Sequence, residues 1–170
     1  MAKRDFLEAL HFIVNLGRLA KPLNAIGPIM TPEQVFHIAN VFALIGWLVL
    51  VFLPSHTAAV EGIARTLVPA LLSIAYAVII IPALLGGGGM GSLGSFEGVA
   101  AILNQPWLLI AGWLHYLAFD LLVGSWEVTT ARSEGIPHYA VLPCLLLTFI
   151  LGPVGFIAFL IVRWLLGSRR

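Results

Sequence analysis

The sequence predicts an all-α fold, a polytopic membrane protein whose four transmembrane helices form a bundle. The first observation is composition: 60% of the 170 residues are hydrophobic, only 10% are charged, and the mean hydropathy is +1.01. A soluble domain carries about 25% charged residues. The second is length, because four apolar segments are each long enough to cross a bilayer, which takes roughly 20 residues. The third is that polar residues recur within these segments at helical spacing.

Prolines and glycines mark the limits of the four expected spans. Pro106 stands where the first turn of the third helix accepts a proline. The fourth segment contains Pro143 and the Gly152-Pro153 pair, which predict at least one kink. The expected spans cover residues 35–53, 66–85, 107–128 and 139–166.

The chain divides into an N-terminal extension, residues 1–29, and a four-helix transmembrane domain, residues 30–170. The extension has apolar residues spaced for a short amphipathic helix on the membrane surface. Thr31 followed by Pro32 predicts a helix start, so we expect folding without the extension. Residues 86–98 hold seven glycines, which favours a flexible linker, with a hinged lid as the alternative.

Basic residues predict the orientation of the spans. An even number of spans places both termini on one side, and the side richer in Lys and Arg faces the cytoplasm. The terminal side carries six basic residues and the opposite side carries two. These are Lys3, Arg4, Arg18, Lys21, Arg169 and Arg170 against Arg65 and Arg132.

The third span carries most of the candidate chemistry. At about 100° per residue, Trp113, Tyr116, Asp120 and Glu127 fall within an arc about 60° wide. This arc suits a polar interior, and the opposite side of the helix is expected to face lipid. His115, Phe119 and Trp126 lie beside the arc, and the expected lipid-facing side holds Ile110, Leu114, Leu117, Ala118, Leu121, Ser125 and Val128.

Asp120 is the strongest candidate because it lies near the middle of its span. An ionisable group at that depth costs roughly 3 kcal/mol and usually marks a pathway, a ligand or a catalytic site. We expect Asp120, Glu127 and His115 to be catalytic. For Asn40 and Tyr76, interhelical hydrogen bonding alone is an equal alternative. The expected substrate-binding residues are His37, Asn40, Tyr76, Trp113, Tyr116, Phe119 and Trp126.

Composition and spacing argue against several other classes of site. The net charge of +1 and the lack of a basic aromatic patch exclude a nucleic-acid partner. The five histidines are far apart, so neither a metal nor another cofactor is expected. A single ion, or a haem between histidines of two helices, remains a weak alternative. Cys144 is expected to be a small buried hydrophobe.

Several runs along the chain carry a family resemblance. The segment from Trp113 to Gly124 is followed by Trp126-Glu127, Gly135-Ile136-Pro137-His138, Pro143-Cys144-Leu145 and Gly152-Pro153-Val154-Gly155, and the first span opens with Pro32 to Asn40. Together these runs resemble the abscisic-acid-deficient, neoxanthin-synthase-like family of membrane proteins. The likeness extends from about Met30 to Arg163.

The resemblance implies a four-span protein of carotenoid metabolism. In plants the family is required to make neoxanthin, an allenic carotenoid, from violaxanthin, a carotenoid epoxide. The chain does not open with the Ser-rich, acidic-poor composition of a transit peptide, which favours a bacterial member in the inner membrane. Because many bacteria lack violaxanthin, we expect the ligand to be a carotenoid or a related isoprenoid, without carrying over the plant substrate.

The expected residues suit this chemistry. Converting an epoxide to an allenic alcohol changes no oxidation state, so it requires no redox cofactor. It requires an acid that protonates the epoxide oxygen and a base that removes a carbon-bound proton. A carboxyl group in an apolar site can serve as the acid, and a second carboxylate or a neutral histidine as the base. Asp120, Glu127 and His115 supply such groups.

The leading function is an isomerase-type enzyme that acts on a carotenoid or related isoprenoid within the bilayer. The main alternative is a carotenoid- or lipid-binding membrane protein without catalysis. A different isoprenoid double-bond isomerase is a further enzymatic alternative. A transporter subunit is a weaker hypothesis, because four spans form a complete transporter only by pairing. Assembly into a homo-oligomer is left open.

Overall fold

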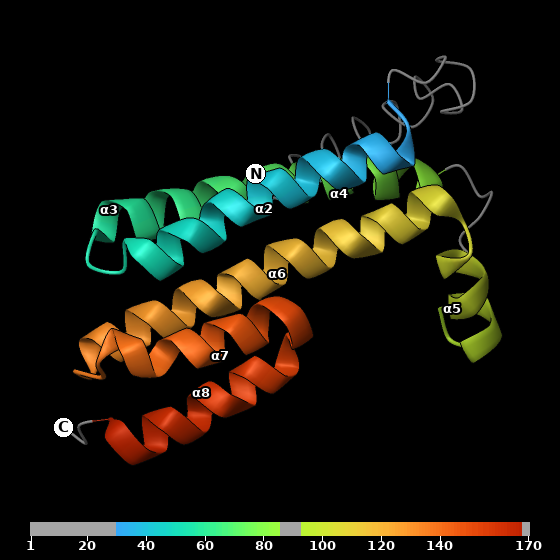
Figure 1. Ribbon diagram of the computed structural model, residues 1–170. Helices are drawn as coiled ribbons and strands as arrows, with labels where there is room; N and C mark the ends of the chain where they lie inside the picture. The colour runs from blue at the N-terminus through green and yellow to red at the C-terminus, as the bar shows by residue number, and fades with distance from the viewer. Residues whose placement is uncertain (1–29, 86–92, 168–170) are drawn as a thin grey trace, which may run out of the picture. The chain divides into compact units, whose positions relative to one another are not determined.

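Helices form every regular element in the described part of the chain, which is residues 30–85 and 93–167 of the computed structural model (Figure 1). The predicted all-α fold is confirmed. The elements are α2 (Pro32–Phe52), α3 (Thr57–Ala59), the π-helix η1 (Val60–Leu67), α4 (Val68–Leu85), α5 (Phe96–Leu103), α6 (Pro106–Ser133), α7 (His138–Leu151) and α8 (Pro153–Leu166).

Three stretches of helix are long and apolar enough to cross a bilayer. They are α2, the continuous run Thr57–Leu85 and α6, with mean hydropathies of 2.3, 2.4 and 1.5. At 1.5 Å per residue each is about 30 Å long or more, which matches the hydrocarbon core. These helices correspond to the first three expected spans and make the chain a membrane protein.

The start of α2 follows from a reciprocal pair of hydrogen bonds. The backbone N–H of Gln34 donates to the Thr31 hydroxyl at 3.3 Å, and the backbone N–H of Thr31 donates to the Gln34 side-chain oxygen at 2.9 Å. This capping box satisfies two N–H groups that the first turn leaves without partners. The helix start expected at Thr31 and Pro32 is confirmed.

The fourth expected span, residues 139–166, is two helices rather than one kinked helix. Gly152 separates α7 from α8 and has a φ of +48°, a region that favours glycine. The chain reverses there, so that α7 runs back along α6 and α8 returns beside α7 (Figure 1). Each helix has 14 residues, or about 21 Å, which is shorter than the hydrocarbon core. We call α7 and α8 the C-terminal hairpin.

The chain forms two compact units. Within the described residues, the first contains 30–36, 75–85 and 93–113, and the second contains 37–74 and 114–167. The second unit holds the C-terminal hairpin and most of the polar residues of α6. The expected extension, residues 1–29, and residues 86–92 of the glycine-rich segment lie outside the described residues. The last part of that segment enters α5, whose N-cap Ser95 accepts a hydrogen bond from the backbone of Gly98.

The side of α6 that was expected to face lipid packs against protein instead. A carbon added at Gly46 of α2 would clash with Leu121, and one added at Gly124 would lie 2.8 Å from Cη2 of Trp47. The expectation is wrong because these glycines let α2 and α6 approach closely, as small residues do between membrane helices. The buried residues of this side are Ile110, Leu114, Leu117, Ala118, Leu121, Ser125 and Val128.

Two arginines hold the ends of helices in the second unit together. Arg132 of α6 donates through Nη1 to the Pro54 carbonyl at 3.2 Å and to the Thr57 hydroxyl at 3.1 Å, which ties α6 to the turn after α2. Arg163 of α8 donates through Nε to Glu134 at 2.8 Å. These hydrogen bonds hold the pKa of the Glu134 carboxyl below its usual value. The last turns of α8 therefore return to the point where α6 ends.

This hairpin geometry predicts where three positions lie across the membrane. In a chain with Cys144→Ser, single cysteines introduced as Ser55→Cys, Ser133→Cys and Leu166→Cys should all react with an impermeant maleimide from the same side. Four full crossings would instead place residue 166 across the bilayer from residues 55 and 133. Labelling of Leu166→Cys from the opposite side to Ser55→Cys would contradict the re-entrant hairpin.

Gly155 offers a test of the packing within the hairpin. A Cβ at this position would clash with the backbone nitrogen and the hydroxyl of Thr148, whereas Gly62 of η1 has open space around it. Overpacking typically costs about 1–3 kcal/mol, so Gly155→Ala should lower the melting temperature in detergent. Gly62→Ala is the matched control and should leave it unchanged or raise it, because alanine favours helix. Equal melting temperatures for the two variants would argue against the close contact.

Candidate functional site

The candidate site lies where the polar side of α6 meets the C-terminal hairpin. Tyr116, Asp120 and Glu127 fall within about 40° of one another around α6. Each lies against a residue of α7 or of the turn that follows it. We call this contact the polar seam; it consists of Tyr116, Asp120, Glu127, Thr148, Phe149 and Gly152.

Glu127 is enclosed between α6 and α7, at the end of the polar seam nearest the C-terminus of α6. Its side chain is fully buried, and Oε1 accepts a hydrogen bond of 2.8 Å from the hydroxyl of Thr148, which is also fully buried. A polar group inside an apolar core is costly unless it is hydrogen-bonded. The Thr148 bond therefore both accommodates Glu127 and fixes α7 against α6.

Asp120 is half-buried and lies against the turn of the hairpin. A carbon added at Gly152 would lie 3.0 Å from Oδ1 and 3.3 Å from Oδ2 of Asp120. Gly152 is therefore required twice, for its positive φ and for the room that it leaves to this carboxyl. At the hairpin turn the backbone of Gly152 therefore lies directly against the polar side of α6, with no side chain between them.

Tyr116 completes the polar seam by supplying a missing hydrogen bond. The carbonyl of Phe149 would normally accept from the N–H four residues later, but that residue is Pro153, which has none. The Tyr116 hydroxyl donates to this carbonyl at 3.2 Å instead. The same hydroxyl interacts with the carboxyl of Asp120. The tyrosine therefore connects the hairpin turn to the half-buried acid.

The two acids are left with unused hydrogen-bonding capacity. Oδ2 of Asp120 and Oε2 of Glu127 are buried and have no hydrogen-bond partner within residues 30–85 and 93–167. In the same ranges the ion pairs are those of Arg65 with Glu61 and of Arg163 with Glu134, so neither acid has a cation. Unsatisfied buried acids are typical of functional sites.

An aromatic flank, formed by His115, Phe119 and Trp126, runs along α6 beside the polar seam. Trp126 is covered by α8, where its ring lies 5.3 Å from Phe159 and 5.6 Å from Phe156. His115 stacks on Phe119 at 4.4 Å, and both side chains are exposed, Phe119 by 54%. Because α8 begins at the hairpin turn, it leaves the part of the flank beyond Asp120 open.

His115 is not brought against the two acids. It lies about 140° from Asp120 around the same helix and about 7.5 Å from it along the axis. The polar seam therefore contains two of the three expected catalytic residues, and the third lies on the aromatic flank. A ligand that reaches both would have to lie across the surface of α6.

The remaining expected binding residues are divided between the two units. Tyr76 and Trp113 belong to the first unit, where Trp113 packs on Phe36 at 5.3 Å. His37, which is exposed, and Asn40, which is half-buried, belong to the second unit. Their grouping around one ligand stays a prediction.

Three residues of the polar seam were not among those expected from the sequence. Thr148 is an isolated polar residue in an apolar run, which is the signal that could have indicated it. Gly152 was expected only as part of a kink. The carbonyl of Phe149 becomes a hydrogen-bond acceptor because a proline follows four residues later. Among the described residues, no three His, Cys, Asp or Glu side chains gather as a metal site would require.

Comparison with known families identifies the group to which this arrangement belongs. The sequence profile of ABA DEFICIENT 4-like proteins matches residues 34–159. The chain belongs to the ABA DEFICIENT 4-like family. The match includes every residue of the polar seam, and it confirms the resemblance inferred from the motifs. Searches of the curated proteins and of the solved structures found no match.

Membership of this family suits a membrane protein linked to carotenoid or abscisic acid metabolism. The three membrane-length helices are consistent with a lipid environment. The polar seam adds two carboxyls in apolar surroundings, one of them half-buried, and these are groups that proton transfer requires.

The bond between Thr148 and Glu127 can be tested through protein stability. Thr148→Val keeps the shape but leaves both Glu127 oxygens without a donor, so it should cost about 1–3 kcal/mol. Thr129→Val is the control, because the Thr129 hydroxyl bonds only to backbone carbonyls of its own helix. Adding Glu127→Leu to Thr148→Val should recover most of the loss in melting temperature. Additive losses in the double variant would contradict the pairing.

Proposed function

We propose that the chain is an intramembrane isomerase that acts on a carotenoid or a related isoprenoid by acid–base chemistry. The observation that carries this proposal is the position of Asp120, a half-buried carboxyl at the hairpin turn. It lies next to the point where the aromatic flank becomes exposed. An apolar ligand dissolved in the bilayer would meet the acid there without entering water.

Asp120 would act as the general acid. In an epoxide-to-allene isomerisation, it donates a proton to the epoxide oxygen as the carbon–oxygen bond breaks. A base then removes a proton from a neighbouring carbon, and that electron pair forms the new double bond, so protons and electrons balance. The Tyr116 hydroxyl, which interacts with the Asp120 carboxyl, would orient this acid.

His115 would be the base and Glu127 a positioning residue. His115 is exposed on the same helix, about 7.5 Å along the axis and about 140° around it from Asp120, so the substrate would have to lie across the surface of α6 to reach both groups. Phe119 stacks on His115 and offers an apolar surface to a polyene. Glu127 is fully enclosed, so it would act through the placement of α7, which its hydrogen bond with Thr148 fixes.

A non-catalytic carotenoid-binding protein is the second candidate, because the exposed aromatic flank would also hold a pigment without reaction. The two candidates differ in what they require of Asp120. Catalysis requires its proton, whereas binding requires only its shape.

The proposal predicts a selective effect of Asp120→Asn. The full chain in nanodiscs would be incubated with violaxanthin as a probe carotenoid epoxide, and product would be measured by chromatography with absorbance detection. The variant should lose about 100- to 10,000-fold in rate, as removal of a general acid typically does. The amount of pigment that stays bound to the variant, and the variant's melting temperature, should be near those of the unchanged chain.

Glu97→Gln is the matched control, because it makes the same acid-to-amide change at an exposed residue of α5 and should leave the rate unchanged. A rate for Asp120→Asn within about tenfold of the unchanged chain would reject the catalytic role. Pigment retained by the unchanged chain without any product would favour the binding protein. Loss of folding in Asp120→Asn would assign the carboxyl to stability instead.

A further inference from the structure

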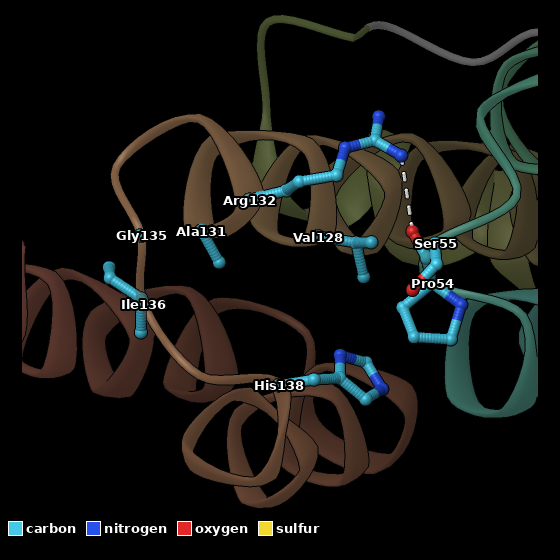
Figure 2. A pocket seen from close by; sticks show the side chains of 8 residues that line it. All are labelled: Pro54, Ser55, Val128, Ala131, Arg132, Gly135, Ile136 and His138. Atoms are coloured by element: carbon cyan, nitrogen blue, oxygen red, sulfur yellow. Dashed lines mark hydrogen bonds between the residues drawn. The ribbon is translucent and has the colours of Figure 1, made fainter.

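A pocket lies where α6 ends, α7 begins and α2 turns toward α3 (Figure 2), and none of its lining residues belongs to the polar seam. Its volume is about 270 Å³, several times the roughly 30 Å³ that one water occupies. No Asp or Glu is among the residues that line it. The lining residues are Pro54, Ser55, Val128, Ala131, Arg132, Gly135, Ile136 and His138.

Arg132 gives this pocket a fixed positive charge. Both N–H groups of its Nη1 are used, on the Pro54 carbonyl and the Thr57 hydroxyl, so the guanidinium is held in place. Within the described ranges, the three N–H groups on Nε and Nη2 have no protein partner. A guanidinium held in this way is suited to bind phosphate oxygens through two parallel hydrogen bonds.

His138 lies on the opposite side of the pocket from Arg132 (Figure 2). Its Nε2 is 3.0 Å from the carbonyl of Val51, and because a carbonyl only accepts, Nε2 must carry the hydrogen. Nδ1 is then an acceptor in the neutral ring and a donor in the protonated ring. Ser55 adds a hydroxyl, so the pocket offers polar groups from three different segments of the chain.

Two exposed aromatic residues indicate that the pocket lies at the depth of lipid headgroups. Tyr139 follows His138 directly and is 76% exposed. Trp164, which is 69% exposed, follows Arg163, whose guanidinium pairs with Glu134 next to the lining residue Gly135. Tyr and Trp are enriched where membrane proteins cross the boundary between lipid and water.

We propose that this pocket binds the phosphate group of an anionic membrane lipid. The phosphate would lie on Arg132, with Ser55 as a further partner, and His138 would form the opposite wall of the pocket. Val128, Ala131 and Ile136 would contact the glycerol and the first acyl carbons, an apolar wall that a free phosphate ion would not use. The proposal does not depend on the isomerase activity.

The test uses the full chain in mild detergent and counts bound lipids by native mass spectrometry. Phosphatidylglycerol is compared with phosphatidylcholine, whose choline would bring a second cation to Arg132. The first phosphatidylglycerol molecule should bind more tightly than the first phosphatidylcholine molecule. Ser55→Asp and Arg132→Gln should each weaken the binding of the first phosphatidylglycerol molecule about tenfold or more. Ser95→Asp is the matched control, because it adds the same charge outside the lining residues and should change nothing.

Ser55→Asp decides the outcome if Arg132→Gln fails to fold, because it keeps the two hydrogen bonds of Arg132 Nη1. Equal binding of the two lipids, or unchanged binding by Ser55→Asp, would overturn the proposal. Inorganic phosphate at about 10 mM should not displace the lipid. Displacement would assign the pocket to free phosphate and overturn the lipid as its ligand.

Discussion

The contact between the polar side of α6 and the C-terminal hairpin is the constraint on which the rest of the second unit depends. An acid in an apolar helix costs roughly 3 kcal/mol on insertion scales, and α6 carries two, Asp120 and Glu127. The hairpin offsets part of this cost for Glu127, to which Thr148 donates, and its Gly152 turn leaves room for Asp120. A single straight fourth span would not bring a glycine turn against the middle of α6.

The same contact gives the two acids different environments. Glu127 lies under α7 and is fully enclosed, whereas Asp120 is half-buried beside the open part of the aromatic flank. α2 covers the other side of α6 closely through Gly46 and Gly124, so ligand access from that side is blocked. The surface beyond the hairpin turn, with His115 and Phe119, is therefore the side from which a bilayer-dissolved ligand would approach Asp120.

Composition and periodicity were sufficient to predict the helices, the capped start of α2 and the polar arc of α6, because these depend on residues near in sequence. They did not predict the features that depend on contacts with a distant segment of the chain. The Leu114 to Val128 side of α6 looks suited to lipid, and only the presence of Gly46 on α2 makes it a helix contact. The Gly152-Pro153 pair indicates a break, but its sharpness depends on the φ of Gly152 and the contact of Gly155 with Thr148. Thr148 acquires its role only through that reversal.

The hairpin encloses Glu127 and leaves Asp120 half-buried, so molecules in the bilayer should reach the two carboxyls to different extents. A lipid-soluble carbodiimide, which reacts with protonated carboxyls in apolar surroundings, tests this difference directly on the full chain in membranes. The modified residues would be located by peptide mass spectrometry. Asp120 should be modified and Glu127 protected, and the protection should be lost when Gly155→Ala disturbs the hairpin. Equal modification of both acids in the unchanged chain, or protection of Asp120, would contradict this arrangement.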